Sequence, residues 1–239
     1  MIPQVIYNGR NLYDFGVLVD ESEIHISPSK DYELTEIPGL NGSLIFDNSR
    51  LRNITIPINC IIRKNFNLNY RALINYLISS EGYNKLELSE DPNHYRLGAF
   101  LESVEPETWE RNKSGQFTLE FECKPERYLT DGSEWHVYAS GSRIPNITRF
   151  NAKPIIRFYG NGTVTIGNKS VTVSGRNSSY FIDIDCELLL CYNGSTNMGQ
   201  YVTVPNGYPM IAPNGSVITY TTDSTVANPC RVMPRWWEV

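Results

Sequence analysis

The stretch EIPGLNGSLIFDNSR, residues 36–50, decides how the first half of this chain folds. Just before its turn, residues 31–37 alternate charged or polar side chains with Tyr, Leu and Ile, as a strand does. The turn is rich in Pro and Gly, and Asn41-Gly42 is a strong hairpin signal because both residue types tolerate positive φ. The sequence therefore predicts an extended hairpin over residues 31–48 with little of its own chain to bury.

Composition indicates a folded chain of one large or two ordinary domains. The 239 residues are 41% hydrophobic, which is enough for a packed core. The net charge of −5 argues against a general nucleic-acid binder, because such proteins need a basic face. We expect no signal peptide and no membrane span, because no basic start precedes an apolar run and no stretch approaches about 18 apolar residues.

The five cysteines do not have the spacing of a metal site. The chain contains no Cys-x-x-Cys motif, and the odd number disfavours a disulfide framework. Cys60, Cys123 and Cys186 fall in register with apolar neighbours, which predicts small buried side chains. The sequence predicts no metal ligands and no cofactor.

Helical periodicity occurs once, and it predicts a helix over about residues 68–80. Asn67 or Asn69 can cap its start, and Gly82 can end it. One face should cover a sheet, since apolar residues recur at helical spacing at Tyr70, Leu73, Ile74, Leu77 and Ile78.

Period-two alternation predicts strands through the rest of the chain. Residues 54–62 and 117–123 alternate apolar with other side chains, and Pro57 indicates a sheet edge or a bulge. From residue 151 onward, short strands with regular turns indicate an antiparallel sandwich. The fold class is therefore mainly β. We predict an α+β N-terminal domain over 1–130, barrel- or sandwich-like with one helix and the hairpin, a linker over 131–150, and a β-sandwich over 151–239.

The stretch FIDIDCE, residues 181–187, carries three carboxylates at every second position. Asp183, Asp185 and Glu187 would line one strand face, and glycoside hydrolases use two such groups. The motif is similar to the DxxDxDxE signature of a chitinase family, but Tyr180 replaces its first Asp and the chain lacks the helices of a (β/α)8 barrel. A calcium site would need further loop oxygens. We favour an amphipathic strand over 180–193 that buries its apolar residues and exposes its acids.

Two further residue types do not form a catalytic constellation. His25, His94 and His136 lie far apart in sequence, with no metal-binding spacing and no adjacent nucleophile motif. Trp236 and Trp237 could stack on a sugar, but adjacent strand residues point to opposite faces. The sequence therefore predicts an assembly or binding protein and no enzyme.

The order of these features resembles the distal tail proteins of siphophages that infect Gram-positive bacteria. The resemblance covers essentially the whole chain and is strongest over residues 31–128. Its signals are the PGLNGSL hairpin ending in DNSR, the helix and strand YRALINYLISSEGYNKLEL at 70–88, and DPNHYRLGA at 91–99.

The resemblance implies a homo-hexameric ring at the distal end of the phage tail. Its N-terminal domain would build the ring, and its C-terminal domain would be a galectin-like sandwich. The ring would join the major tail tube protein to the tail-associated hub protein, with receptor-binding proteins as possible further partners, and DNA would pass through its channel without specific binding. The protein would be a virion component made in the host cytoplasm. The hairpin would complete its apolar surface on the next subunit through Tyr32, Leu34, Ile37, Pro38, Leu40, Leu44 and Phe46.

Two other functions fit parts of the sequence. A carbohydrate-binding module could recognise host cell-wall glycan through the C-terminal sandwich, although the galectin pattern His-x-Asn-x-Arg is absent at His136. A glycoside hydrolase would use Asp183, Asp185 or Glu187. The ring predicts a stable oligomer, the module predicts a monomer with glycan affinity, and the hydrolase predicts a substrate whose cleavage stops in an Asp185→Asn variant.

Overall fold

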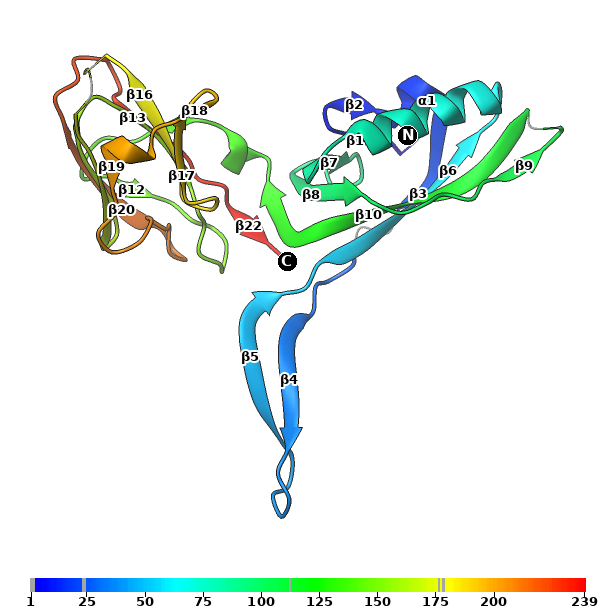
Figure 1. The fold of residues 1–239 in the computed structure, drawn as a ribbon, viewed down its shortest axis with the longest axis horizontal. Coiled ribbons are helices and arrows are strands. Elements are labelled where there is room, and N and C mark those ends of the chain that lie inside the picture. The colour runs from blue at the N-terminus through cyan, green and yellow to red at the C-terminus, as the bar shows by residue number, and fades with distance from the viewer. Residues whose placement is uncertain (1–2, 23–24, 112, 176, 178) are drawn as a thin grey trace. The chain divides into compact units, whose positions relative to one another are not determined.

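A computed structural model describes residues 3–22, 25–111, 113–175, 177 and 179–239. The chain divides into two compact units, residues 1–127 and residues 128–238. Strands make up most of the regular structure in both units, as the mainly β prediction requires. Figure 1 gives the element labels used below.

The first unit combines a main sheet, one α-helix among its described residues, and a separate hairpin. Its elements are β1 (Val5–Tyr7), β2 (Arg10–Asn11), the 3-10 helix η1 (Leu12–Phe15), β3 (Val17–Ser22), β4 (Lys30–Glu36), β5 (Ser43–Leu51), β6 (Ile54–Ile62), α1 (Phe66–Ser79), β7 (Asn84–Leu88), β8 (His94–Phe100), β9 (Glu107–Trp109) and β10 (Ser114–Leu129).

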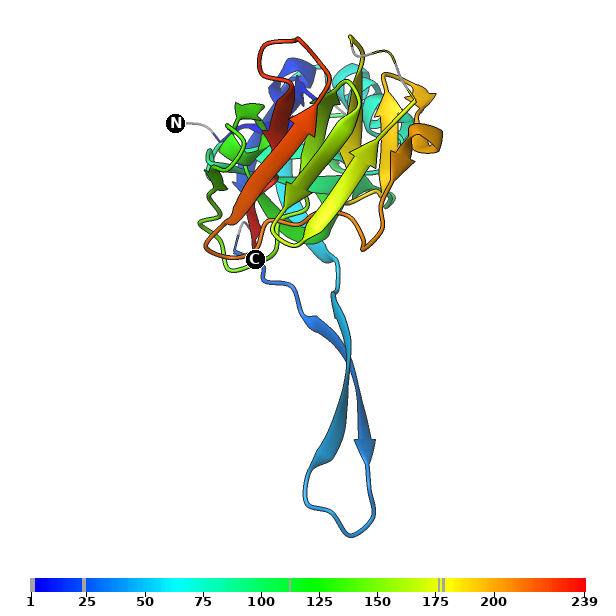
Figure 2. The ribbon, with the colours of Figure 1, turned by 90° about the vertical axis from the view of Figure 1, so that its left-hand side faces the viewer.

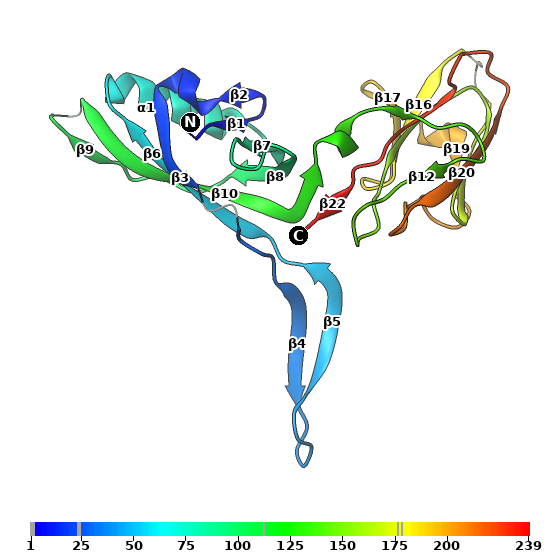
Figure 3. The same cartoon turned by 180° about the vertical axis from the view of Figure 1, so that it is seen from behind.

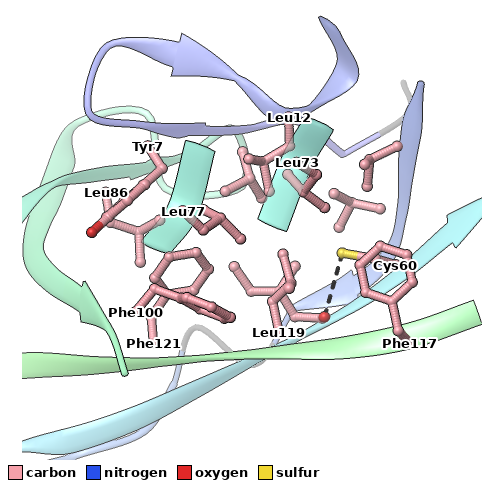
Figure 4. Close-up of a cluster of buried hydrophobic side chains, with 14 of the residues drawn as sticks. Tyr7, Leu12, Cys60, Leu73, Leu77, Leu86, Phe100, Phe117, Leu119 and Phe121 are labelled. Atoms are coloured by element: carbon pink, nitrogen blue, oxygen red, sulfur yellow. Dashed lines mark hydrogen bonds between the residues drawn. The ribbon is translucent and has the colours of Figure 1, made fainter. Parts of the chain in front are cut away.

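The main sheet has the order β2-β1-β7-β8-β10-β6-β3, and β9 also pairs with β10. The alternation in β6 and β10 is confirmed, because Ile54, Ile56, Ile58, Cys60 and Ile62 are buried while their neighbours are not. Figure 4 shows Leu73 and Leu77 of α1 directed at Leu119 and Phe121 of β10. The helix therefore covers one face of the sheet, as predicted.

Packing sets the start of α1. We predicted residue 68, but the helix begins at Phe66, after Asn65 with a φ of 53° and no side-chain cap. The Phe66 ring stacks on the Tyr70 ring with 5.2 Å between centroids. The backbone N–H of Phe66 donates to the Lys113 carbonyl oxygen at 3.2 Å. These contacts stabilise the first turn where the expected Asn cap does not.

Ile78 is the apolar residue of the helix pattern that the prediction placed wrongly. Leu73 and Leu77 are buried, whereas Ile78 is 68% exposed. The sheet contacts a narrow stripe of the helix, because residues 73 and 77 lie one turn apart and residue 78 is rotated away from them.

Replacing Ile78 with Ala should therefore leave stability almost unchanged. We expect the free energy of unfolding to shift by no more than about 0.5 kcal/mol, the usual range for exposed positions. Urea unfolding followed by circular dichroism measures this change. A loss of about 2 kcal/mol or more, typical of a buried aliphatic residue, would contradict the exposed position.

Pro57 is part of β6, which lies between β10 and β3 in the sheet order. Glu120 of β10 pairs with Pro57, and the described pairing of β3 with β6 runs from Val17–Ile62 to Ser22–Ile58. Residues 23–24, which follow Ser22, lie outside the described residues, so the expectation of a sheet edge or a bulge at Pro57 stays a prediction.

The second unit is built from two sheets around one core. Its elements are η2 (Asp131–Ser133), β11 (His136–Val137), β12 (Arg143–Ile144), β13 (Ile155–Tyr159), β14 (Gly162–Ile166), β15 (Lys169–Val173), β16 (Phe181–Asp185), β17 (Leu190–Asn193), β18 (Thr196–Asn197), η3 (Gly199–Tyr201), β19 (Val202–Thr203), β20 (Ser216–Thr222), β21 (Cys230–Met233) and β22 (Trp237–Glu238).

One sheet has the order β11-β21-β13-β16-β17-β18, and the other has the order β12-β20-β14-β15-β19. In Figure 2 the orange, green and yellow strands side by side at the front are β20, β14 and β15. Ile156, Phe158, Val164 and Ile182 from both sheets are buried in one cluster, as in a sandwich. Residues 131–150, which we predicted as a linker, supply β11, β12 and the buried Ile144 to this unit.

The predicted long strand over 180–193 is in fact a hairpin. β16 ends at Asp185, a turn follows, and β17 begins at Leu190. Leu189, the last residue of this turn, has a left-handed φ of 58°. Consequently Leu188 and Leu190, which we expected to be buried, are exposed.

Candidate functional site

The candidate site is the hairpin of β4 and β5, which extends from the first unit without lying on another element (Figures 1 and 3). The strands pair from Tyr32–Asp47 to Glu36–Ser43. A six-residue loop, residues 37–42, joins them, and the Leu40 N–H donates to the Ile37 carbonyl oxygen at 3.1 Å. Gly39 and Gly42 both have positive φ, which this loop requires. The hairpin prediction is confirmed, with a longer loop than a two-residue Asn-Gly turn.

The structure places every predicted contact residue on this hairpin, and each is exposed. The apolar side chains other than Pro38 are between 43% and 60% exposed. The set comprises Tyr32, Leu34, Ile37, Pro38, Leu40, Leu44 and Phe46. From Tyr32 to Arg50 every residue of the hairpin is exposed, so the chain itself gives this element no cover. A two-stranded hairpin alone is marginally stable in water.

Sequence reasoning missed one apolar residue of the hairpin. The Ile45 side chain is 66% exposed, more than the 60% of Leu40. It pairs with Leu34 across the ladder, so the two side chains lie on one face. The run Leu44-Ile45-Phe46 gave the signal, because adjacent apolar residues in a strand lie on opposite faces.

An ion-pair cluster that the sequence did not reveal closes the base of the hairpin. Asp31 is 6% exposed, and its carboxylate accepts hydrogen bonds from Arg50 Nε at 2.6 Å and from Arg52 Nε at 3.0 Å and Nη2 at 2.9 Å. The Arg52 N–H also donates to the Ser29 carbonyl oxygen. The Arg50 guanidinium, followed by that of Arg52, lowers the pKa of Asp31 to about 2.

This cluster should make the hairpin base resistant to acid. Because the folded-state pKa of Asp31 lies below the ordinary 3.8, its contribution is complete above pH about 4 and is lost as pH falls through about 2. We expect amide hydrogen exchange at Arg52 to stay slow from pH 6 to pH 4. In the Asp31→Asn variant it should be faster throughout, whereas the exposed Glu33→Gln control should match the parent. Equal exchange in all three proteins would contradict the cluster's role.

The carboxylates of FIDIDCE are bound by arginines and do not face solvent, contrary to our prediction. Asp183 is 5% and Asp185 2% exposed. Asp183 accepts two hydrogen bonds from Arg157, both 2.7 Å, and Asp185 accepts from Arg235 Nη2 at 2.6 Å. Both carboxylates are therefore bound by arginine side chains within the fold, which indicates a structural role.

The Arg157 guanidinium also lies between two aromatic rings. Its central carbon is 4.6 Å from the Trp135 ring centroid and 4.3 Å from that of Phe181. Both are cation–π contacts between the guanidinium and the face of an aromatic ring. The hydrogen bonds to Asp183 raise the pKa of Arg157. The cluster stabilises the β13 sheet.

The two C-terminal tryptophans are separated, as predicted. Trp236 is buried and donates from Nε1 to the Pro145 carbonyl oxygen at 2.7 Å. Trp237 is half-buried and stacks on Phe150 with 4.2 Å between centroids. The pair therefore does not form one sugar-stacking platform.

A polar groove of about 400 Å³ lies on the main sheet. Gln116 donates to Glu107 at 2.7 Å and Thr118 donates to Asn59 at 2.8 Å, so these groups bind one another. Within the described residues, no group of three or more His, Cys, Asp or Glu is arranged to hold a metal ion. In the same part of the chain, no helix has the length and apolar character needed to cross a membrane.

Comparison with known proteins connects the first unit with phage tails. Residues 10–123 match the family model described as the phage tail protein RIFT-related domain. This range includes the hairpin, α1 and most of the main sheet. A search of curated protein sequences gave no match.

Two solved structures share the fold along nearly the whole chain. The SPP1 Dit protein, described as a paradigm of the hub adsorption apparatus in phages infecting Gram-positive bacteria, has a TM-score of 0.72 at 15% identity and covers 97% of each chain. A chain of the phage p2 baseplate in its activated conformation with Sr has a TM-score of 0.56 at 10% identity, covering 94% of this chain and 100% of that one. Together with the family match, they confirm the resemblance predicted from the sequence.

Proposed function

Because residues 10–123 match the family model described as the phage tail protein RIFT-related domain, we propose that this chain is a structural hub protein of the phage tail tip. Six copies form a ring that joins the tail tube to the tail-associated hub protein and to the adhesion apparatus. The observation that carries this proposal is the exposed apolar hairpin within the residues that match this family model.

In the proposed ring, the hairpin of each copy contacts the next copy. A head-to-tail contact of this kind closes into a ring when the rotation permits. The contact residues are Tyr32, Leu34, Ile37, Pro38, Leu40, Ile45, Leu44 and Phe46. Burying one such side chain contributes about 1.5–3 kcal/mol, so several together can hold a subunit interface.

The proposed ring surrounds a channel at the tip of the phage tail. DNA passes through the channel without specific binding, and the net charge of −5 is compatible with this, since an acidic protein does not bind the phosphate backbone strongly. The protein is a virion component at the distal end of the tail, and it needs no catalytic group or cofactor for this role. The ion-paired Asp183 and Asp185 support a structural rather than a hydrolytic second unit.

The mass of the purified protein in solution tests the ring. Sedimentation at several micromolar concentrations should give a particle of six copies of the 27.2 kDa chain. A monomer at every concentration, together with measurable glycan affinity on an array, would contradict the ring and favour the carbohydrate-binding module.

A further inference from the structure

The hairpin presents apolar side chains on both faces. Residues that pair directly across an antiparallel ladder point to the same side. The pairs Tyr32–Asp47 and Leu34–Ile45 therefore place Tyr32, Leu34 and Ile45 on one face, called face one. The pairs Glu33–Phe46 and Thr35–Leu44 place Phe46 and Leu44 on the opposite face, called face two. All five side chains are exposed.

A hairpin that lies on one surface needs one apolar face. Antiparallel strands with one covered face alternate apolar and polar residues, and the polar ones face water. Face two departs from this rule, since Leu44 and Phe46 are 44% and 52% exposed and flank the Ile45 of face one. An apolar residue at each of positions 44, 45 and 46 fits an element that is covered on both sides.

We propose that each hairpin is inserted between surfaces of neighbouring copies of this chain, so that copies cover face one and face two together. This inference rests on the proposed ring, which places a copy on either side of every subunit. The length of the hairpin, residues 30–51, also fits a contact with neighbouring copies, because one side of a standard protein interface has about 20–30 residues. The two faces also differ in side chains, as a head-to-tail contact between unlike patches requires.

Adjacent positions 44 and 45 allow a matched test with engineered thiols. Leu44→Cys labels face two and Ile45→Cys labels face one, while Asn168→Cys, at an exposed turn of the second unit, serves as a control. The native cysteines are all buried, and burial raises the pKa of Cys60, Cys123 and Cys230 to about 12. Burial also raises the pKa of Cys186 and Cys191, so the engineered thiol is the reactive one.

The measurement is the rate of maleimide labelling of purified protein at pH 7, assembled and diluted to monomer, with the mass recorded for each sample. We expect assembly to slow labelling at both 44 and 45 by about tenfold or more, and to leave position 168 unchanged. Full-size assemblies in which only one of the two positions is protected would overturn the two-faced insertion and leave the ring intact. Monomers under all conditions would instead overturn the ring.

Discussion

The double variant Leu34→Ser/Phe46→Ser is expected to be a folded monomer under conditions in which the parent protein forms rings. Leu34 lies on face one and Phe46 on face two, so each replacement removes apolar area from a different contact. Each buried side chain of this kind contributes about 1.5–3 kcal/mol, and the pair should weaken every subunit contact by about 3–6 kcal/mol. Sedimentation velocity measures the loss of the oligomer.

Stability of the isolated chain should not follow this loss. Both side chains are exposed in the single chain, so its thermal melting should change little. The control Glu33→Gln/Thr35→Ser alters two polar neighbours on the same strand and should keep the ring. A full-size oligomer in the apolar double variant, or a monomer in the polar control, would contradict the role of the apolar side chains.

The Asp185→Asn variant should lose about 3–5 kcal/mol of stability in the second unit, the usual cost of removing one partner from a buried ion pair. Asp185 Oδ1 accepts hydrogen bonds from the Glu187 and Leu188 N–H groups, both 2.9 Å, and from Arg235 Nη2 at 2.6 Å. Asparagine removes the charge and leaves the Arg235 guanidinium, whose side chain is 14% exposed, with the longer ion pair to Glu187 at 3.7 Å and the Lys153 carbonyl oxygen at 2.9 Å.

Tryptophan fluorescence during urea unfolding reports on this change, because Trp135, Trp236 and Trp237 all lie in the second unit. The exposed Glu134→Gln substitution is the control and should shift the transition by no more than about 0.5 kcal/mol. Parent-like stability in Asp185→Asn would show that the ion pair is not structural. If Asp185 were instead a catalytic residue of a hydrolase, the Asp185→Asn variant would lose cleavage of a substrate while its urea unfolding transition stayed unchanged.

Local pattern predicted the features that depend on local geometry. Alternation in residues 54–62 and 117–123 identified β6 and β10, and the Pro-Gly and Asn-Gly pairs located the loop of the hairpin. The exposed apolar residues of β4 and β5 also followed from the sequence, because no facing pattern was available to cover them. These features depend on periods of two and on turn residues, which a single sequence displays.

Features that depend on distant partners were not predictable in the same way. Asp183 and Asp185 looked like solvent-facing acids because their partners, Arg157 and Arg235, are 26 and 50 residues away. The prediction of Ile78 as a core residue was wrong because the width of the covered stripe depends on the sheet beneath it. The start of α1 likewise depends on the Phe66 contacts with Tyr70 and Lys113.

The Asp31 cluster explains how an otherwise uncovered hairpin can be held at its base. Arg50 and Arg52 both come from the β5 side and bind one carboxylate on β4. The pairing of β4 with β5 shifts register next to this cluster. There Ser49 has a φ of 57°, and its backbone N–H donates to Asp47 Oδ1 at 2.7 Å. The base is therefore fixed by polar contacts, while the outer part offers apolar side chains for assembly.

Electron microscopy of the purified protein tests the central claim most directly, because it images the hairpin and its neighbours together. The account predicts closed particles with sixfold symmetry, in which the hairpin of each subunit is buried against adjacent subunits. Single chains whose hairpin is folded back and covered by their own residues, or rings in which the hairpins stay free in solvent, would contradict it.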